Sequence, residues 1–112
     1  MLVTGGNGFV GRHLGLALMQ AGHEVDVYDL PNNILVYSDL VRAVRTADLV
    51  WHLAAVSDLT WAASPLRETM AVNVEGTRMV AAISAAESKP LCYVSTCCVY
   101  GNQPHYPATE EL

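Results

Sequence analysis

The stretch Met1-Leu2-Val3-Thr4-Gly5-Gly6-Asn7-Gly8-Phe9-Val10-Gly11 decides the fold of this chain. Apolar residues 1–3 predict a short strand, after which Gly6, Gly8 and Gly11 match the spacing G-x-G-x-x-G. Glycines let a chain turn tightly off a strand, let bare backbone approach phosphate groups and let the next helix pack close to the sheet. The N–H groups at the start of that helix then face an anion. The pattern predicts a strand, a turn and a helix that bind a dinucleotide pyrophosphate.

The residues that follow the glycines strengthen this prediction. Residues 9–21 predict a helix that ends at Gly22. The apolar stripe of this helix is predicted to comprise Phe9, Leu14, Leu16, Ala17, Leu18 and Ala21. Residues 24–28 alternate as a second strand that ends in Asp29. A carboxylate about 20 residues beyond the glycines can accept hydrogen bonds from an adenosine ribose. The alternative is that Asp29 is only a solvated carboxylate at the end of a strand.

The rest of the chain alternates predicted strands and helices. Strands are predicted at residues 34–37, 49–53 and 91–95, and helices at 39–45 and from Pro65 to about Ser88. Asp39 and Ser64 are the expected N-caps of the two helices. Right-handed crossovers between such strands predict an α/β fold, a Rossmann-type doubly wound parallel sheet in the order 3-2-1-4-5. Residues 102–112 are predicted to form a loop.

Composition agrees with one buried sheet and argues against several kinds of partner. The 112 residues suffice for one domain, and 52% of them are hydrophobic. The net charge of −5 argues against nucleic acid and against an anionic membrane. No apolar stretch suits a membrane span and no signal peptide is apparent, so a cytoplasmic location is expected. The three cysteines, Cys92, Cys97 and Cys98, suit neither a disulfide framework nor a metal site, so buried and reduced thiols are expected.

Several short motifs follow one another along the chain. They are Thr4-Gly5-x-x-Gly8-x-x-Gly11, Asp39-Leu40, His52-Leu53-Ala54-Ala55, Asn73-Val74-Glu75-Gly76-Thr77, and Ser95-Thr96 followed by Val99-Tyr100-Gly101. In this order they resemble the extended short-chain dehydrogenases/reductases, and within them the NAD-dependent epimerase/dehydratase family. The resemblance covers essentially the whole chain. It implies an oxidoreductase that acts by hydride transfer between NAD and a nucleotide sugar.

The resemblance also implies roles for individual residues. It implies cofactor binding by Gly5, Gly8, Phe9, Val10, Gly11, Asp29, Asp39, Leu40, Leu53, Ala54, Ala55, Asn73 and Ser95. Asp29 would take the ribose hydroxyls, which favours NAD over NADP, whereas Asp39 would contact adenine or simply cap its helix. Asn73 would tie its helix to neighbouring backbone, and Gly76 would let that helix pack closely against the sheet. His52 is expected to be a structural histidine.

Thr96 is the catalytic residue that the resemblance implies within this chain. In the family, a Ser or Thr there hydrogen-bonds the substrate hydroxyl or carbonyl, together with a Tyr base and a Lys four residues after it. The alternative is that Ser95 and Thr96 only terminate their strand. Lys89 is the only lysine, and Ala85 stands four residues before it. The chain is therefore expected to be an N-terminal fragment, truncated after the fifth strand, without the substrate domain and inactive alone. A homodimer is expected at full length.

Two departures from the family pattern and two alternative functions complete the prediction. Cys97 and Cys98 stand where sugar-nucleotide 4,6-dehydratases carry Asp-Glu, so a dehydratase of that type is not expected. The segment from Leu30 to Asn33 is short, which predicts an open adenosine pocket. One alternative is a non-catalytic dinucleotide-binding module. The other is an NAD(P)-dependent reductase of a steroid or flavonoid alcohol, against which Asp29 weighs.

Overall fold

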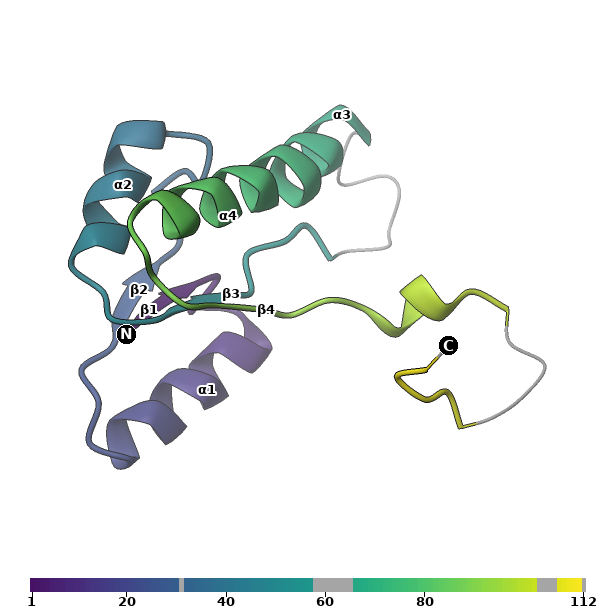
Figure 1. The fold of residues 1–112 in the computed structure, drawn as a ribbon, viewed down its shortest axis with the longest axis horizontal. Coiled ribbons are helices and arrows are strands. Elements are labelled where there is room, and N and C mark those ends of the chain that lie inside the picture. The colour runs from purple at the N-terminus through teal and green to yellow at the C-terminus, as the bar shows by residue number, and fades with distance from the viewer. Residues whose placement is uncertain (31, 58–65, 103–106, 112) are drawn as a thin grey trace.

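The computed structural model describes residues 1–30, 32–57, 66–102 and 107–111, which form a parallel sheet between two layers of helices (Figure 1). The elements are β1 (Leu2–Thr4), α1 (Phe9–Gln20), β2 (Asp26–Tyr28), α2 (Tyr37–Arg45), β3 (Val50–His52), α3 (Leu66–Met70), the π-helical segment η1 (Ala71–Gly76), α4 (Thr77–Ala86), β4 (Leu91–Tyr93) and the short 3-10 helix η2 (Cys97–Tyr100). Strands and helices thus alternate as the sequence predicts. No described helix is long and apolar enough to cross a membrane.

The sheet places β1 at its centre. Its strands are all parallel and lie in the order β2-β1-β3-β4. Val3 of β1 is paired with Val27 of β2 and with Trp51 of β3, and Trp51 is paired with Cys92 of β4. Helix α1 covers one face, while α2 and the run from α3 to α4 cover the other (Figure 1). The predicted Rossmann-type, doubly wound α/β fold is confirmed.

The strand predicted at residues 34–37 is wrong. Ile34 and Leu35 form a turn, and α2 already begins at Tyr37. The turn is closed by the N–H of Val36, which donates to the Asn33 carbonyl at 3.0 Å. A crossover from β2 to a parallel neighbour needs about a dozen residues, and the chain offers far fewer before Ile34. The observed order is therefore the predicted one without its third strand, and Ile34 is buried in the core instead.

The long helix predicted from Pro65 to about Ser88 is confirmed over its described part. Elements α3, η1 and α4 follow one another without a gap from Leu66 to Ala86. Ser64 and Pro65, the predicted start, lie outside the described residues. Segment η1 is a π-helical insertion, and such insertions are frequent at functional sites. It contains Asn73, one of the predicted site residues.

Helix α1 meets the sheet through glycines and not through the apolar stripe predicted for residues 9–21. Its buried residues are Gly11 and Gly15, whereas Phe9 is 83% and Leu16 57% exposed. A Cβ on Gly11 would lie 2.4 Å from the Gly5 carbonyl oxygen, so this glycine lets the start of the helix come close to the turn, whereas Gly15 leaves room for a side chain. The predicted stripe therefore does not form the buried face of α1.

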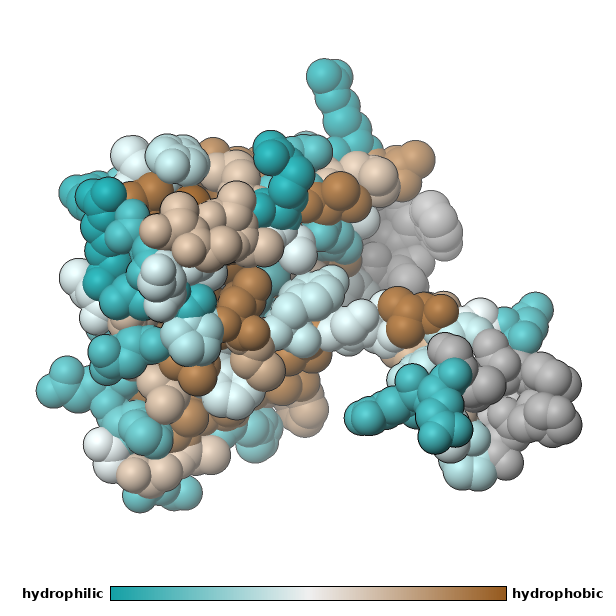
Figure 2. Space-filling model, in the orientation of Figure 1, coloured by the Kyte–Doolittle hydropathy of each residue, from teal (hydrophilic) through white to brown (hydrophobic). Residues whose placement is uncertain are grey.

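The core lies between the sheet and the α2–α4 layer. Its buried members are Leu2, Tyr28, Ile34, Leu40, Val44, Ala47, Val50, Val80 and Ile83. Strand β4 lies at an edge of the described sheet, and the chain after it leaves the body with apolar side chains on its surface (Figures 1 and 2). Cys97 and Cys98 are free and exposed there. The expectation of buried thiols is wrong for both, because they follow the end of an edge strand.

Candidate functional site

The glycine turn joins the carboxyl end of β1 to α1 and leaves no room for side chains. Gly5 has a φ of +70°, and a Cβ there would lie 2.7 Å from the backbone nitrogen of Ala54. A Cβ on Gly11 would lie 2.4 Å from the Gly5 carbonyl oxygen, and one on Gly8 3.3 Å from the same atom. The left-handed residue is thus Gly5, which precedes the first glycine of the predicted G-x-G-x-x-G. The turn is bare backbone, as close approach to a phosphate requires.

Helix α1 begins at this turn with unused hydrogen-bond donors. Gly8 is its N-cap and has no side chain to cap it. The N–H groups of Phe9 and Val10 have no acceptor among the residues that the structure describes, and both residues are exposed. The first turn of α1 contains no acidic residue. Free N–H groups and the positive end of the helix dipole favour an anion at this position.

Asp29 lies at the carboxyl end of β2, beside the glycine turn. Its Oδ2 accepts a hydrogen bond from the N–H of Asn7 at 2.8 Å, and its Oδ1 accepts one from the N–H of Leu30 at 2.7 Å. Asp29 is half-buried. Each carboxylate oxygen can accept a second hydrogen bond. The carboxylate is therefore held in place by backbone and keeps the acceptor capacity that a ribose diol needs.

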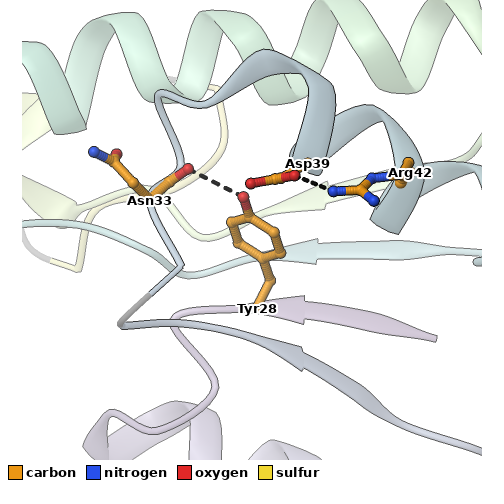
Figure 3. Close-up of polar contacts among 4 residues, drawn as sticks. All are labelled: Tyr28, Asn33, Asp39 and Arg42. Atoms are coloured by element: carbon orange, nitrogen blue, oxygen red, sulfur yellow. Dashed lines mark hydrogen bonds and ion pairs between the residues drawn. The ribbon is translucent and has the colours of Figure 1, made fainter.

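Asp39 is not the N-cap of α2, because the helix begins two residues earlier and Val36 takes that position. Asp39 pairs with Arg42 and lies beside the Tyr28 hydroxyl (Figure 3). That hydroxyl donates to the Asn33 carbonyl at 3.0 Å. Burial, and to a smaller extent the negative charge of Asp39, raise the pKa of Tyr28 above its usual range. The hydroxyl therefore keeps the proton that it donates. A carboxylate in a first helical turn also stabilises the helix.

Leu40, which follows Asp39, is fully buried in the core. Its side chain packs with the other core residues and leaves no surface at this position for a ligand. Its backbone N–H donates to the carbonyl of Val36 at 3.1 Å. In the structure, Leu40 therefore anchors α2 to the core.

His52 is a structural histidine, as predicted. It is fully buried on β3, with Nδ1 2.6 Å from Thr4 Oγ1 and Nε2 2.9 Å from Thr77 Oγ1. Thr4 Oγ1 also accepts a hydrogen bond from the N–H of Ala54 at 3.2 Å. Burial lowers the pKa of His52 below its usual range, which favours the neutral ring. The ring links β1, β3 and α4, and Thr4 extends this network to the backbone that contacts Gly5.

Asn73 ties segment η1 to the backbone after β3, as predicted. Its Oδ1 accepts from the N–H of Val56 at 2.7 Å, and its Nδ2 donates to the Val56 carbonyl at 3.0 Å. Gly76 packs elsewhere than predicted. A Cβ on Gly76 would lie 2.9 Å from Cγ2 of Ile34, so the glycine admits that side chain and not the sheet. The prediction for Gly76 is wrong because the turn at Ile34 fills this space.

We expect Asn73→Asp to lower the free energy of unfolding by about 1–3 kcal/mol. A carboxylate can still accept from the N–H of Val56, but it has no proton to donate to the Val56 carbonyl. Urea denaturation at neutral pH measures this loss. Asn32→Asp is the matched control, because Asn32 is exposed and its side chain makes no hydrogen bond to a described residue. The same loss in both variants would contradict the assigned role of Asn73.

Ser95 and Thr96 follow the carboxyl end of β4, and both are exposed. Thr96 is the N-cap of η2, and its Oγ1 accepts from the N–H of Cys98 at 3.2 Å. No described residue accepts the Thr96 hydroxyl proton, which is therefore free to be donated. Because the strands are parallel, Asp29 and the glycine turn lie at the carboxyl edge of the sheet, and the chain continues from β4 beyond the same edge to Thr96. That edge is where ligands bind in open α/β sheets.

One feature beside this edge was not predicted from the sequence. A groove of about 400 Å³ runs between α1 and β2. Its lining residues are Gly6, Asn7, Gly11, Arg12, Gly15, Leu16, Met19, Val25 and Val27. The spacing of Arg12, Leu16 and Met19 along α1 places them on one helix face, which is the signal that could have identified Arg12.

A bare glycine turn, a helix N-terminus and a fixed carboxylate at adjacent strand ends define a dinucleotide-binding α/β domain. These groups fit the pyrophosphate and the adenosine ribose of such a cofactor. The chain belongs to the NAD dependent epimerase/dehydratase family, whose model matches residues 1–112.

Individual relatives show the range of this similarity. A UDP-N-acetyl-alpha-D-glucosaminuronate decarboxylase from Bacillus cytotoxicus is 29% identical, in an alignment that covers 89% of this chain and 37% of the decarboxylase. A 3-beta-hydroxysteroid dehydrogenase from Mycolicibacterium neoaurum is 38% identical, in an alignment that covers 70% of this chain and 26% of the dehydrogenase.

The crystal structure of a short-chain dehydrogenase/reductase superfamily protein from Agrobacterium tumefaciens with bound NAD is similar as well. It is 29% identical with a TM-score of 0.86, over 98% of this chain and 37% of that protein. This chain therefore spans between 26% and 37% of the length of these three proteins.

Proposed function

We propose that this chain binds NAD and forms the cofactor-binding part of an oxidoreductase that acts on a nucleotide sugar. The observation that carries the proposal is the contact between the glycine turn and the carboxylate of Asp29, which accepts from the N–H of Asn7 at 2.8 Å. Membership in the NAD dependent epimerase/dehydratase family supports it. The similarity to a UDP-sugar decarboxylase supports the substrate class.

Three parts of the chain would hold the cofactor. The bare backbone of residues 5–11 and the free N–H groups of α1 would bind the pyrophosphate. Asp29 would accept hydrogen bonds from the adenosine ribose, and its charge supports NAD over NADP. Residues 53–55 and Ser95 would lie along the rest of the cofactor. For Asp39, the ion pair with Arg42 supports the role of stabilising α2 over contact with adenine.

Thr96 would orient the substrate at the carboxyl edge of the sheet. Bound NAD supplies a hydride acceptor. Thr96 would donate its free hydroxyl proton to a substrate oxygen, while the N–H of Cys98 holds its Oγ1 at 3.2 Å. No Tyr in these 112 residues has a Lys four positions after it, and Lys89 is the only lysine. We therefore propose that these residues bind the cofactor without turning over substrate. A homodimer, which the family resemblance implies, and the cytoplasmic location expected from the sequence complete the proposal.

Asp29→Asn is expected to weaken NAD binding by about tenfold to a hundredfold. Losing a charge-assisted hydrogen bond costs about 1.5–3 kcal/mol, and Asn can still accept from the N–H of Asn7. Isothermal titration of the full chain with NAD measures the change. Asp26→Asn removes the same charge from an exposed residue at the start of β2 and should leave the affinity within about threefold. Equal losses in both variants would show a general effect of charge and contradict the role of Asp29.

A reductase of a steroid alcohol is the second candidate, because the relative from Mycolicibacterium neoaurum is named as a 3-beta-hydroxysteroid dehydrogenase and is 38% identical. Saturation-transfer NMR on the NAD-loaded chain, with a UDP-sugar and a hydroxysteroid in separate samples, distinguishes the two. We expect contact with the UDP-sugar. Contact with the steroid alone would favour the second candidate. The non-catalytic module is the weaker alternative, since both of these relatives are named as enzymes.

A further inference from the structure

We propose that Arg12 binds the 2′-phosphate of NADP, so that the site accepts NADP as well as NAD. The proposal rests on the nucleotide binding proposed above and concerns the specificity of that site. It applies to the adenosine ribose, where NAD carries a hydroxyl and NADP a phosphate. The Asp29 carboxylate alone would favour NAD at this position.

Arg12 extends from the first turn of α1 toward β2. Its own N–H donates to the Gly8 carbonyl at 3.0 Å, which fixes its backbone directly after the glycine turn. Arg12 lines the groove between α1 and β2 together with Asn7. The N–H of Asn7 is the group that holds Asp29 at 2.8 Å. Arg12 and Asp29 therefore flank the same short piece of backbone, one from α1 and the other from β2.

The guanidinium of Arg12 has no protein partner within the described ranges. Arg42, Arg45 and Arg78 each form an ion pair with a nearby carboxylate. Arg12 is exposed and makes no such pair with a described residue. An unpaired guanidinium can turn toward a phosphate without breaking an existing contact. Its donors match two phosphate oxygens at once.

The negative charge of Asp29 would repel the 2′-phosphate of NADP, so binding of NADP needs a cation nearby. Both of its oxygens accept backbone N–H groups, from Asn7 and Leu30, so the carboxylate is held beside the ribose site. A phosphate monoester carries close to two negative charges at neutral pH. The single positive charge of Arg12 offsets the repulsion from the single negative charge of Asp29. We therefore expect NADP to bind about tenfold more weakly than NAD, but measurably.

The test compares three ligands on the full chain by isothermal titration. They are NAD, NADP and adenosine 2′,5′-bisphosphate, which carries the 2′-phosphate without the nicotinamide. Arg12→Gln keeps a long side chain of good helix propensity and removes the charge. We expect it to weaken NADP and the bisphosphate by at least about tenfold and NAD by less than about threefold. Arg67→Gln, an exposed position on the opposite face of the sheet, should leave all three affinities within about threefold.

Each other outcome has a definite meaning, provided that circular dichroism shows the variant to be folded. Equal weakening of NAD and NADP in Arg12→Gln would overturn the proposal, because Arg12 would then act on a group common to both. Binding of NAD without binding of NADP or the bisphosphate would also overturn it and leave the proposed function intact. Bisphosphate binding that depends on Arg12, without binding of NAD, would support Arg12 and overturn the proposed function. Failure of all three ligands would overturn both.

Discussion

Gly11→Ala is expected to abolish measurable NAD binding and to lower the free energy of unfolding by about 1–3 kcal/mol. A Cβ on Gly11 would lie 2.4 Å from the carbonyl oxygen of Gly5 and 2.7 Å from Cα of Gly6. Both are backbone atoms, so no side chain can rotate away, and the glycine turn itself must move. The turn is the part of the chain that would face the pyrophosphate, so its displacement removes the binding surface.

Gly15→Ala is the matched control for this prediction. Gly15 lies four residues further along α1, and a Cβ there would meet only Cγ1 of Val25, at 4.0 Å. Replacing a helical glycine by alanine without a clash should stabilise the chain by about 0.5–1 kcal/mol. Urea denaturation and NAD titration are applied to both variants. If Gly11→Ala bound NAD like the unchanged chain and had the same stability, the glycine turn would not be the site.

His52→Leu is expected to lower the free energy of unfolding by about 2–5 kcal/mol, which is a large fraction of the stability of a single domain. The substitution removes the contacts of both ring nitrogens, at 2.6 Å to Thr4 and 2.9 Å to Thr77. The buried hydroxyl of Thr4 and the half-buried hydroxyl of Thr77 each lose a partner, and a buried group without its hydrogen bond costs about 1–3 kcal/mol. Leucine fills much of the space, so the loss reports mainly on the hydrogen bonds.

His52 also gives the stability a defined dependence on pH. Burial lowers the pKa of its ring in the native state, whereas in the unfolded chain the pKa is about 6.5. Below about pH 6.5 the unfolded chain binds a proton that the native chain excludes, so stability falls as the pH falls, by up to about 1.4 kcal/mol per unit. Above that pH the ring is neutral in both states and this dependence vanishes.

Urea denaturation at about pH 7.5 and about pH 5.5 measures this dependence, since the two values lie on either side of the unfolded pKa. The drop should be largely absent from His52→Leu. It should persist in His23→Gln, because His23 is exposed. If the drop were the same in the unchanged chain and in His52→Leu, the ring would not be the group responsible.

The sequence predicts the parallel sheet well because two kinds of signal agree there. The glycines after residues 1–3 define one strand, turn and helix, and apolar runs mark the strands that pair on either side of it. The apolar run at residues 34–37 wrongly predicted a strand, because an apolar pattern does not show whether enough residues precede it for a crossover from β2. Ile34 is buried as a strand residue would be, but it is buried from a turn. Only the assembled fold separates these two arrangements.

Site residues were predictable where their role follows from their place along a strand or helix. Asn73 sits on a helix that returns to the backbone after β3, and its predicted contact with neighbouring backbone is confirmed. Asp29 follows β2 as predicted, but its hydrogen bond from the N–H of Asn7 was not predicted, and its role at a ribose stays a prediction. Arg12 was missed because its direction depends on how α1 packs. Gly11 and Gly15 are the buried residues of the helix, and Arg12 lies on the face that lines the groove with Val25 and Val27. The apolar stripe predicted for α1 pointed to a different buried face.

The most direct test of the account is an NMR titration of the nitrogen-labelled chain with NAD, followed through its backbone amide signals. We predict saturable shifts that concentrate on residues 5–11, on Leu30 beside Asp29 and on residues 53–55, while the amides of α4 change little. Residues 5–11, Leu30 and residues 53–55 follow β1, β2 and β3, so they meet at the carboxyl edge of the sheet. A folded chain that showed no saturable shift, or shifts confined to other segments, would contradict the central claim that the glycine turn and Asp29 bind NAD.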